Sequence, residues 1–282
     1  MRTVYVNGEY LPEDAAKISI FDRGFLFGDG VYEVSSVLDG RLIDNAAHLI
    51  RLQRSLDALS LPRPASDEEI VAIQNELIDR NQLSEGVVYL QVTRGAADRD
   101  FNWPEEPRPS LVLFTQQKAI RQNPAAAEGI AVATVPDLRW KRRDIKTVNL
   151  LPASWAKEQA RAAGAQDAWM VEDGHVTEGS SNNTFIVTSD GTLVTRQLST
   201  DILHGITRHA VMKLAAEIQL RIEERPFTPE EAKAAREAFA TSASSFVMPV
   251  VEIDGQTIGD GTPGPIAQRL RTLYIETALE AA

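Results

Sequence analysis

A polar, alanine-rich segment at residues 122–129 divides the sequence into two stretches that carry different patterns of apolar residues. Its sequence, Gln-Asn-Pro-Ala-Ala-Ala-Glu-Gly, is typical of a connector, because proline and glycine interrupt regular elements. The 282 residues leave room on each side for a unit of ordinary domain size. We therefore predict an N-terminal α+β domain at residues 1–120, an interdomain connector at 121–129 and a second domain at 130–282.

The stretch before the connector alternates strand and helix signals. Asn7-Gly8 lies between two short strand-like runs and favours a two-residue hairpin turn, since both residues tolerate a positive φ. Apolar residues recur every three or four positions at residues 45–60, which predicts an amphipathic helix. Ser66 and Glu69 have the spacing of a capping box at the start of a second helix. We expect strands at residues 3–6, 9–11, 87–93 and 111–116.

The stretch after the connector has a mixed pattern of strand and helix signals. Thr228 before Pro229 is typical of a helix start. The remaining expected elements are strands at residues 130–135, 168–171, 184–187 and 192–195, and helices at 154–163, 206–217 and 265–279. The whole pattern predicts an α+β fold, with a smaller N-terminal α/β domain and a larger, strand-rich C-terminal domain. We expect the active site between the two domains, where ligand sites commonly occur.

The composition excludes several classes of function. A net charge of −11 opposes binding to nucleic acid, because that affinity depends on neutralising phosphates with basic residues. No run of 18 apolar residues is present and no apolar leader with a cleavage site stands at the N-terminus, so we expect no membrane partner and a cytoplasmic location. The absence of cysteine excludes thiolate nucleophiles and cysteine-bound metals.

Several common catalytic motifs are missing or match poorly. Residues 259–264 have the spacing Gly-x-Gly-x-x-Gly, but Pro263 and Pro265 do not fit the strand-to-helix turn of a dinucleotide site. The histidines lack the spacing of a zinc site, no Gly-Lys pair forms a phosphate-binding loop, and residues 179–182 do not match a serine-hydrolase elbow. We expect no metal site. The remaining possibilities are a reaction that uses a lysine side chain, or no catalytic function.

Lys146 stands where a basic stretch leads into an apolar one. On position alone it is a surface lysine that precedes a helix. The neighbouring Ile145, Val148 and Leu150, however, would carry the segment into the interior and remove water from the ammonium group. A desolvated lysine has a lowered pKa and can form a Schiff base with a carbonyl compound. Both interpretations remain open from the residues alone.

Four blocks of the sequence, at residues 21–34, 144–151, 177–182 and 205–208, carry a recognisable pattern, and the first contains Gly-Asp-Gly-Val-Tyr-Glu-Val. The four blocks resemble those of the class IV aminotransferases, which use pyridoxal 5′-phosphate (PLP) and have the architecture called fold type IV. The form of the first block is most similar to the D-amino-acid aminotransferases. The resemblance covers nearly the whole chain. It implies a transaminase that moves the amino group from a D-amino acid, such as D-alanine or D-glutamate, to a 2-oxo acid, with the second domain binding the cofactor.

The resemblance also implies which residues bind the cofactor. It assigns Lys146 as the residue that holds PLP as an internal aldimine and shuttles the α-proton, so that the amino group passes through pyridoxamine phosphate. It assigns Glu178 to the pyridine nitrogen and Arg51 to the phosphate. Taken alone, Glu178 is a turn residue and Arg51 a surface residue of an amphipathic helix. Further residues implied to contact the cofactor are Ser181, Asn182, Ile206, Thr207, Ser242, Ala243 and Ser244.

The substrate carboxylate is implied to contact Tyr32 and Arg99, with Arg99 supplied by the neighbouring subunit of a homodimer. Taken alone, Tyr32 is a half-buried strand residue. The sequence departs from the family at Phe101, where a histidine is expected. An apolar ring there predicts weaker carboxylate binding and some activity on (R)-amines. Branched-chain aminotransferases, (R)-selective amine transaminases and aminodeoxychorismate lyases share the scaffold and remain alternatives, whereas the intact Lys146 disfavours a non-enzymatic binding protein.

Overall fold

The computed structural model describes residues 1–281 of the chain, which divides into two compact units. Unit 1 comprises Met1–Ala119, Ile145–Asn149 and the last described residue. Unit 2 comprises Ile120–Asp144 and Leu150–Glu280. The segment that contains Lys146 therefore lies with unit 1, although the chain on both sides of it belongs to unit 2.

Unit 1 is built on an antiparallel sheet whose described strands have the order β2-β1-β6-β5-β3-β4. The predicted hairpin is confirmed, since Val6 pairs with Glu9 across a turn in which Asn7 and Gly8 have φ values of 49° and 103°. The strands are β1 (Thr3–Val6), β2 (Glu9–Pro12), β3 (Gly30–Leu38), β4 (Arg41–Leu42), β5 (Glu85–Thr93) and β6 (Ser110–Gln117).

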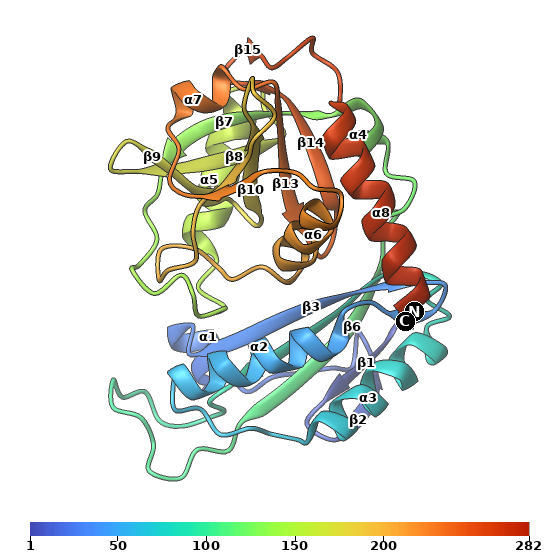
Figure 1. Ribbon diagram of the computed structural model, residues 1–282. Coiled ribbons are helices and arrows are strands. Elements are labelled where there is room, and N and C mark those ends of the chain that lie inside the picture. The colour runs from blue at the N-terminus through green and yellow to red at the C-terminus, as the bar shows by residue number, and fades with distance from the viewer. Residues whose placement is uncertain (282) are drawn as a thin grey trace. The chain divides into compact units, whose positions relative to one another are not determined.

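Two amphipathic helices, α2 (Asn45–Ala58) and α3 (Asp67–Arg80), cover one face of this sheet (Figure 1). Their leucine and isoleucine stripes pack with alternate residues of β3, β5 and β6 in one buried core, because side chains two positions apart in a strand share a face. The predicted capping box is confirmed: Ser66 Oγ accepts from the N–H of Glu69 at 3.2 Å, and the Glu69 carboxylate accepts from the N–H of Ser66 at 2.7 Å. A short helix, α1 (Arg23–Phe27), begins after Asp22 and was not predicted.

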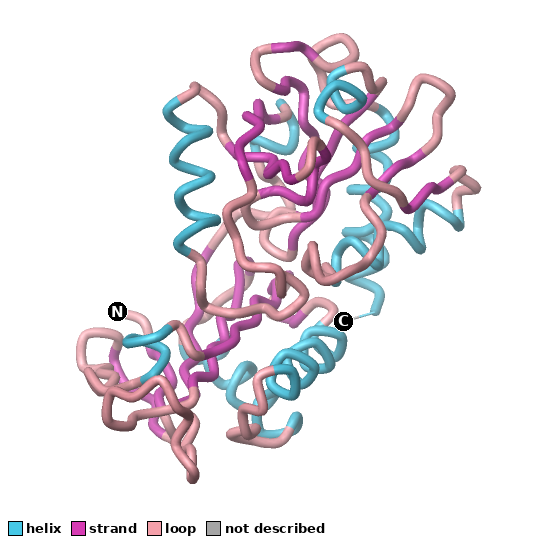
Figure 2. Tube along the Cα trace, turned by 90° about the vertical axis from the view of Figure 1, so that its left-hand side faces the viewer, coloured by secondary structure: helices cyan, strands magenta, loops and turns pink. Residues whose placement is uncertain are grey.

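Unit 2 contains a larger mixed sheet, whose strands are magenta in Figure 2. Its described order is β12-β11-β10-β13-β14-β7-β8-β9, with β15 paired to β14. The pairs β14–β7, β7–β8 and β11–β12 are parallel and the others antiparallel. The strands are β7 (Ile130–Pro136), β8 (Asp167–Glu172), β9 (His175–Gly179), β10 (Asn183–Val187), β11 (Leu193–Thr195), β12 (Ile222–Glu224), β13 (Glu237–Ser242), β14 (Phe246–Ile253) and β15 (Gln256–Thr257).

Both faces of this sheet are covered near β7, as a parallel arrangement requires. Val132 enters a core that contains Trp169 and Phe227, whereas the next residue, Ala133, packs against the alanine face of α5. Helix α5 lies in the crossover between the parallel strands β7 and β8, and Lys146 lies in the same crossover. The helices are α4 (Pro124–Glu128), α5 (Leu151–Ala162), α6 (Ile206–Glu217), α7 (Pro229–Lys233) and α8 (Pro265–Ala281).

The elements of unit 2 correct several sequence predictions. The segment at 122–129 is not purely a connector, because Asn123 accepts from the N–H of Ala125 at 3.0 Å and caps the short helix α4. Helix α5 begins at Leu151, three residues before the predicted start. Strands β9, β13 and β14 were not predicted. The α+β class itself is confirmed, with a sheet in each unit.

None of the helices within residues 1–281 is long and apolar enough to cross a membrane. The same residues contain no group of three or more histidine, aspartate and glutamate side chains that could hold a metal ion.

Candidate active site

The Lys146 segment extends the sheet of unit 1 along the edge of β3. The N–H of Tyr32 donates to the carbonyl of Lys146 at 3.0 Å, and the N–H of Val148 donates to the carbonyl of Gly30 at 3.1 Å. Strand β4 pairs only with the other end of β3, at Val37 and beyond, among the described pairings. The segment therefore adds backbone pairing at the end of β3 that β4 leaves open, and this pairing fixes Lys146 beside Tyr32.

The side chain of Lys146 lies over the ring of Tyr32, with Nζ 4.1 Å from the ring centroid. An ammonium at this distance is attracted to the electron-rich face of the ring. Lys146 is half-buried, and within residues 1–281 its ammonium forms no ion pair or hydrogen bond. Such an amine, partly shielded from water and without a carboxylate partner, suits a nucleophile that attacks a carbonyl.

The ring of Tyr32 belongs to an aromatic row on the sheet face opposite the hydrophobic core of unit 1. Tyr32 stacks on Tyr89 with centroids 5.6 Å apart, and Tyr89 stacks on Phe114 at 4.7 Å. Burial and the neighbouring Tyr32 raise the pKa of the Tyr89 phenol, so this ring stays neutral. Its hydroxyl donates to Gln91 at 2.7 Å. The row holds Tyr32 in place beneath Lys146.

Two of the blocks that carry the family resemblance contact each other at Gly28 and Asn149. The amide of Asn149 donates to the carbonyl of Gly28 at 3.1 Å. Gly28 ends helix α1 with a φ of 67°, and a Cβ at this position would lie only 2.2 Å from Asn149 Oδ1. Glycine is therefore required both by the left-handed backbone and by the close approach of Asn149.

Arg51 lies on α2 and is buried against Glu33 of β3. Its Nε and Nη2 donate to the two carboxylate oxygens of Glu33, each at 2.7 Å, and His48 Nδ1 lies 2.7 Å from the same carboxylate. Burial opposes ionisation of Glu33, but the charge and hydrogen bonds of Arg51, with those of His48, outweigh it and hold the pKa of Glu33 well below its usual range. Arg51 is thus a buried, oriented guanidinium rather than the surface residue that the helix pattern alone suggests.

Arg99 and Phe101 lie on the loop that follows β5. The Arg99 guanidinium is 5.6 Å from the ring centroid of Phe27 and 5.7 Å from that of Phe101. Phe101 is 81% exposed and contacts Phe27 edge-on. Within the described residues, no hydrogen bond, ion pair or ring contact connects Arg99 with Tyr32 or Lys146. The structure therefore brings Lys146 and Tyr32 together at the edge of β3. Arg51 is anchored to the neighbouring residue of the same strand, Glu33, whose side chain lies on the opposite face of the sheet. Arg99 and Phe101 have no such contact with these residues within the described part of the chain.

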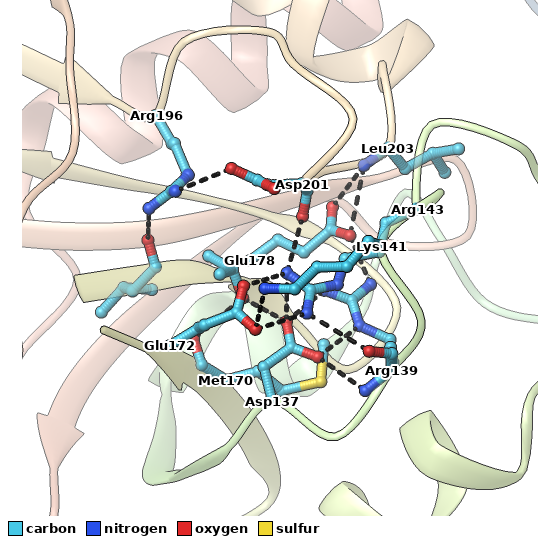
Figure 3. Close-up of polar contacts among 12 residues, drawn as sticks. Asp137, Arg139, Lys141, Arg143, Met170, Glu172, Glu178, Arg196, Asp201 and Leu203 are labelled. Carbon is cyan, nitrogen blue, oxygen red and sulfur yellow. Dashed lines mark hydrogen bonds and ion pairs between the residues drawn. The ribbon is translucent and has the colours of Figure 1, made fainter. Parts of the chain in front are cut away.

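In unit 2, the candidate site is organised around Glu178, which lies in strand β9 and not in a turn (Figure 3). One carboxylate oxygen accepts from Arg139 Nη1 at 2.5 Å, and the other accepts from Asn183 Nδ2 at 2.9 Å. The N–H of Leu203 donates to both oxygens, at 3.2 and 3.1 Å. Burial raises the pKa of Glu178, while the charge and hydrogen bond of Arg139 and the N–H of Leu203 oppose that rise.

Arg139 connects Glu178 with a second buried carboxylate, Asp137 (Figure 3). Its Nε and Nη2 donate to the two oxygens of Asp137 at 2.9 and 2.7 Å. Thr177 donates to Asp137 at 2.6 Å, and Arg143 Nη1 lies 3.3 Å from it. Burial opposes ionisation of Asp137, but the hydrogen bond and charge of Arg139 lower its pKa. Two carboxylates thus hold the Arg139 guanidinium in one orientation, and Glu178 is paired with a positive charge whose position is fixed.

The sequence analysis missed Arg139 and Asn183, both of which contact Glu178. Asn183 also donates to the carbonyl of Leu203 at 2.9 Å, and a Cβ on Gly205 would lie 2.0 Å from its side-chain oxygen. An asparagine at the start of an apolar strand is unusual and was the available signal. Ser181 is exposed, and the amide of the half-buried Asn182 donates to Asp167 at 2.9 Å, so neither approaches Glu178 through a hydrogen bond.

Two groups of hydrogen-bond donors lie next to Asn183. Helix α6 begins at Ile206 and Thr207 after Gly205, without a side-chain cap on its first amides. Thr241 of β13 lies opposite Asn183 in the sheet, and its buried hydroxyl has no hydrogen-bond partner within residues 1–281. The turn after β13 contains Ser242, Ala243 and Ser244, in which Ser242 Oγ lies 2.7 Å from Ser245 Oγ. Helix N-termini and clustered hydroxyls of this kind suit an anion.

The fold, together with the residues around Lys146 in unit 1 and those around Glu178 in unit 2, is that of an aminotransferase. The family model for amino-transferase class IV matches residues 30–253, and the chain belongs to this family.

Individual aminotransferases are similar to this chain over nearly its whole length. The chain is 38% identical to D-alanine aminotransferase of Staphylococcus aureus (strain N315) over 281 residues, covering 98% of this chain and 99% of that protein. It is 38% identical to D-alanine aminotransferase of Bacillus licheniformis over 271 residues, covering 95% and 94% of the two chains. Among solved structures, a branched-chain amino acid aminotransferase of T.th. with pyridoxamine 5′-phosphate has a TM-score of 0.91 and 26% identity, covering 100% of this chain and 95% of that one. The fold-type-IV architecture expected from the sequence is thereby confirmed.

Proposed function

We propose that this chain is a PLP-dependent transaminase that moves the amino group of a D-amino acid, such as D-alanine or D-glutamate, to a 2-oxo acid. The observation that carries the proposal is the Lys146 amine, half-buried over the ring of Tyr32 and without a carboxylate partner within the described residues. Membership of the aminotransferase family supports it, as does the identity to D-alanine aminotransferases over nearly the whole chain.

The donors and acceptors of both units fit PLP. The cofactor presents a pyridine nitrogen, which a buried carboxylate such as Glu178 suits, and a phosphate, which needs several N–H and O–H donors. The unpartnered hydroxyl of Thr241 and the uncapped amides of Ile206 and Thr207 provide such donors. Arg51 adds a buried guanidinium. The similar T.th. structure, which contains pyridoxamine 5′-phosphate, supports the same choice of cofactor.

When bound, PLP supplies an electron-withdrawing ring that stabilises negative charge at the α-carbon of an attached amine. Lys146 would hold the cofactor through Nζ until the substrate amine displaces it. The freed amine would then take the proton from the α-carbon of the amino donor and, in the reverse half-reaction, deliver a proton to the α-carbon of the acceptor. Glu178, kept oriented by Arg139 and Asn183, would accept a hydrogen bond from the protonated pyridine nitrogen. Arg51, Ser242, Ala243, Ser244, Ile206 and Thr207 would bind the phosphate, with Ser181 and Asn182 shaping the surrounding wall.

The substrate carboxylate would be bound by Tyr32 of one subunit and by Arg99 of the partner subunit, since Arg99 and Tyr32 of the same chain have no contact within the described residues. A guanidinium binds a carboxylate through two parallel hydrogen bonds, and the phenol adds a third donor. Phe101 supplies no donor, so Arg99 would carry most of this interaction, and some (R)-amines would also react.

Branched-chain substrates are the second candidate. The observation in their favour is the structural similarity to the T.th. branched-chain amino acid aminotransferase. The higher identity to D-alanine aminotransferases favours D-amino acids instead.

A substrate panel tests the proposal. D- and L-amino acids and (R)-amines are assayed with pyruvate and 2-oxoglutarate as acceptors. We expect turnover of D-alanine, and a fall of about 10²–10⁴-fold in Lys146→Ala, the range for loss of a positioned general base. Lys157→Ala is the matched control, since Lys157 is 52% exposed on α5. Turnover of L-branched-chain amino acids alone would favour the second candidate, and full activity of Lys146→Ala would contradict the role of the lysine.

We also propose that the protein acts as a homodimer in the cytoplasm. The apolar side chains of Ile20, Phe21 and Phe25 are exposed by 70%, 50% and 74%, which supports a protein partner at this surface of unit 1. Light scattering after size exclusion tests the dimer, with Phe25→Asp expected to shift it toward monomer. Cell fractionation tests the location.

A further inference from the structure

Arg23, Asp29 and Arg94 form a second group of buried charges in unit 1. One oxygen of Asp29 accepts from Nε of Arg23 and from Nε of Arg94, both at 2.8 Å. The exposed fractions of these side chains are 3% for Arg23, 9% for Asp29 and 1% for Arg94. Two guanidiniums and one carboxylate leave an excess positive charge, which other oxygen atoms must stabilise in a buried site.

Backbone carbonyls supply these oxygen atoms. Arg94 donates to the carbonyls of residues 59 and 60 at 2.8 and 3.1 Å, immediately after the C-terminal end of α2, where the helix dipole favours a cation. Arg23 donates through Nη1 to the carbonyls of residues 100 and 102, at 2.6 and 3.3 Å. Asp29 therefore connects, through its two arginines, the end of α2 with the loop that follows β5.

The two carbonyls bound by Arg23 lie on either side of Phe101 in the chain. The Arg23 guanidinium also lies 4.4 Å from the ring centroid of Phe27, and Phe27 contacts Phe101 with centroids 5.7 Å apart. Arg99 lies 5.6 Å and 5.7 Å from the centroids of these two rings. One buried arginine thus holds the backbone next to Phe101 and one of the two rings that surround Arg99.

We propose that Arg23, held by Asp29 and Arg94, is a positioning residue for the carboxylate-binding loop. It holds the backbone of residues 100–102 so that Arg99 is ordered before substrate arrives. When a loop becomes ordered only as substrate binds, the cost of ordering it lowers the affinity for substrate. A loop that is already ordered avoids this cost. The effect falls on substrate binding and not on the proton transfer at Lys146. The inference rests on the proposed function for its kinetic consequence, whereas the ordering of the loop does not depend on it.

The test compares Arg23→Met with Arg80→Met in the full chain. Arg80 is a matched control, because it also pairs with a carboxylate, Glu76, and lies 4.3 Å from an aromatic ring, but it is 44% exposed on α3. Three quantities are measured: the rate at which chymotrypsin cleaves after Phe101, mapped by mass spectrometry, and the KM and kcat for D-alanine. Asp29→Asn is a second variant that releases both arginines, for use if Arg23→Met does not fold. Emission of Trp103, whose ring lies 4.0 Å from the Arg94 guanidinium, reports the loop independently.

We expect Arg23→Met to raise both the cleavage rate and KM by about 10-fold or more, because each lost hydrogen bond to a charged group corresponds to roughly a factor of 10 in an equilibrium. kcat should change by less than about threefold, as for loss of an interaction made equally in ground and transition states. Arg23→Lys, which keeps the charge, should recover part of KM. Cleavage unchanged from Arg80→Met would overturn the inference, as would a fall in kcat at constant KM. A wild-type protein inactive on every D-amino acid would refute the proposed function, and the cleavage rate would still decide whether Arg23 orders the loop.

Discussion

Replacing Arg139 by methionine tests the claim that Glu178 is held by a buried cation. The substitution keeps much of the apolar volume and removes three hydrogen bonds, two to Asp137 and one to Glu178. The side chains left behind are almost inaccessible, at 0% exposed for Asp137 and 4% for Glu178. Water therefore cannot replace the guanidinium without a rearrangement of unit 2.

The expected loss in the free energy of unfolding is about 3 kcal/mol, at the lower end of the range for breaking a buried ion pair. The lower end applies because each carboxylate keeps other partners. Asp137 keeps its hydrogen bond from Thr177 and its ion pair with Arg143, and Glu178 keeps its hydrogen bonds from Asn183 and from the N–H of Leu203. Coupling to Glu178 alone should account for about 1.5–3 kcal/mol, the range for a hydrogen bond between charged groups.

A double-mutant cycle measures this coupling directly. Arg139→Met, Glu178→Gln and the double variant are unfolded in urea without cofactor, so that ligand binding does not contribute to stability. Trp169 in the core of unit 2 reports unfolding of that unit. Arg142→Met is the control, since its guanidinium is 47% exposed and its pair with Asp144 should contribute less than about 1 kcal/mol. A coupling energy below about 0.5 kcal/mol would show that Arg139 and Glu178 are independent and would refute the reasoning.

Three further predictions concern unit 1. Since Arg51 and His48 hold the pKa of Glu33 low despite burial, Glu33 stabilises the fold fully above its unfolded pKa of about 4.3 and progressively less as the pH falls below it. Glu33→Gln should therefore flatten the decline in unfolding free energy between about pH 5 and pH 3, measured in urea, and an unchanged slope would contradict this. Gly28→Ala should destabilise the protein by more than the roughly 1 kcal/mol of a left-handed alanine, because Asn149 must also move; calorimetry showing no fall in Tm would count against it. Ser66→Ala should cost about 1 kcal/mol, with Ser66→Gly milder, and equal unfolding curves would exclude the capping role.

Much of unit 1 could be predicted from the sequence because local chemistry determines it. The hairpin at Asn7-Gly8 follows from backbone sterics, and the start of α3 follows from the capping box. The boundary of α5 was missed, because its first turn carries no capping side chain and begins with Leu151. Strands β13 and β14 have continuous burial rather than alternation, so their periodicity does not distinguish them from buried helix.

From the sequence, only those site residues could be predicted whose type and sequence block already indicate a chemical role. Lysine and glutamate stood out as candidates through the blocks that contain them. Arg139 is a different case, because it lies 39 positions before Glu178 and nothing local indicates which carboxylate it pairs with. The same holds for Arg23, whose partners at residues 100 and 102 are far away in the chain. Long-range ion pairs and hydrogen bonds of this kind depend on the sheet order, which the sequence pattern did not specify.

The pairing of residues 145–149 with β3 has a consequence for how the protein is synthesised. Residues 1–119 leave the ribosome first and contain all other strands of the sheet of unit 1, as far as the structure describes it. Until residue 149 has emerged, β3 presents unpaired N–H and C=O groups at Gly30–Tyr32, an exposed edge that other chains can pair with. The nascent N-terminal unit is therefore completed only by a piece of chain that arrives later, and no single cut in the sequence yields that unit whole.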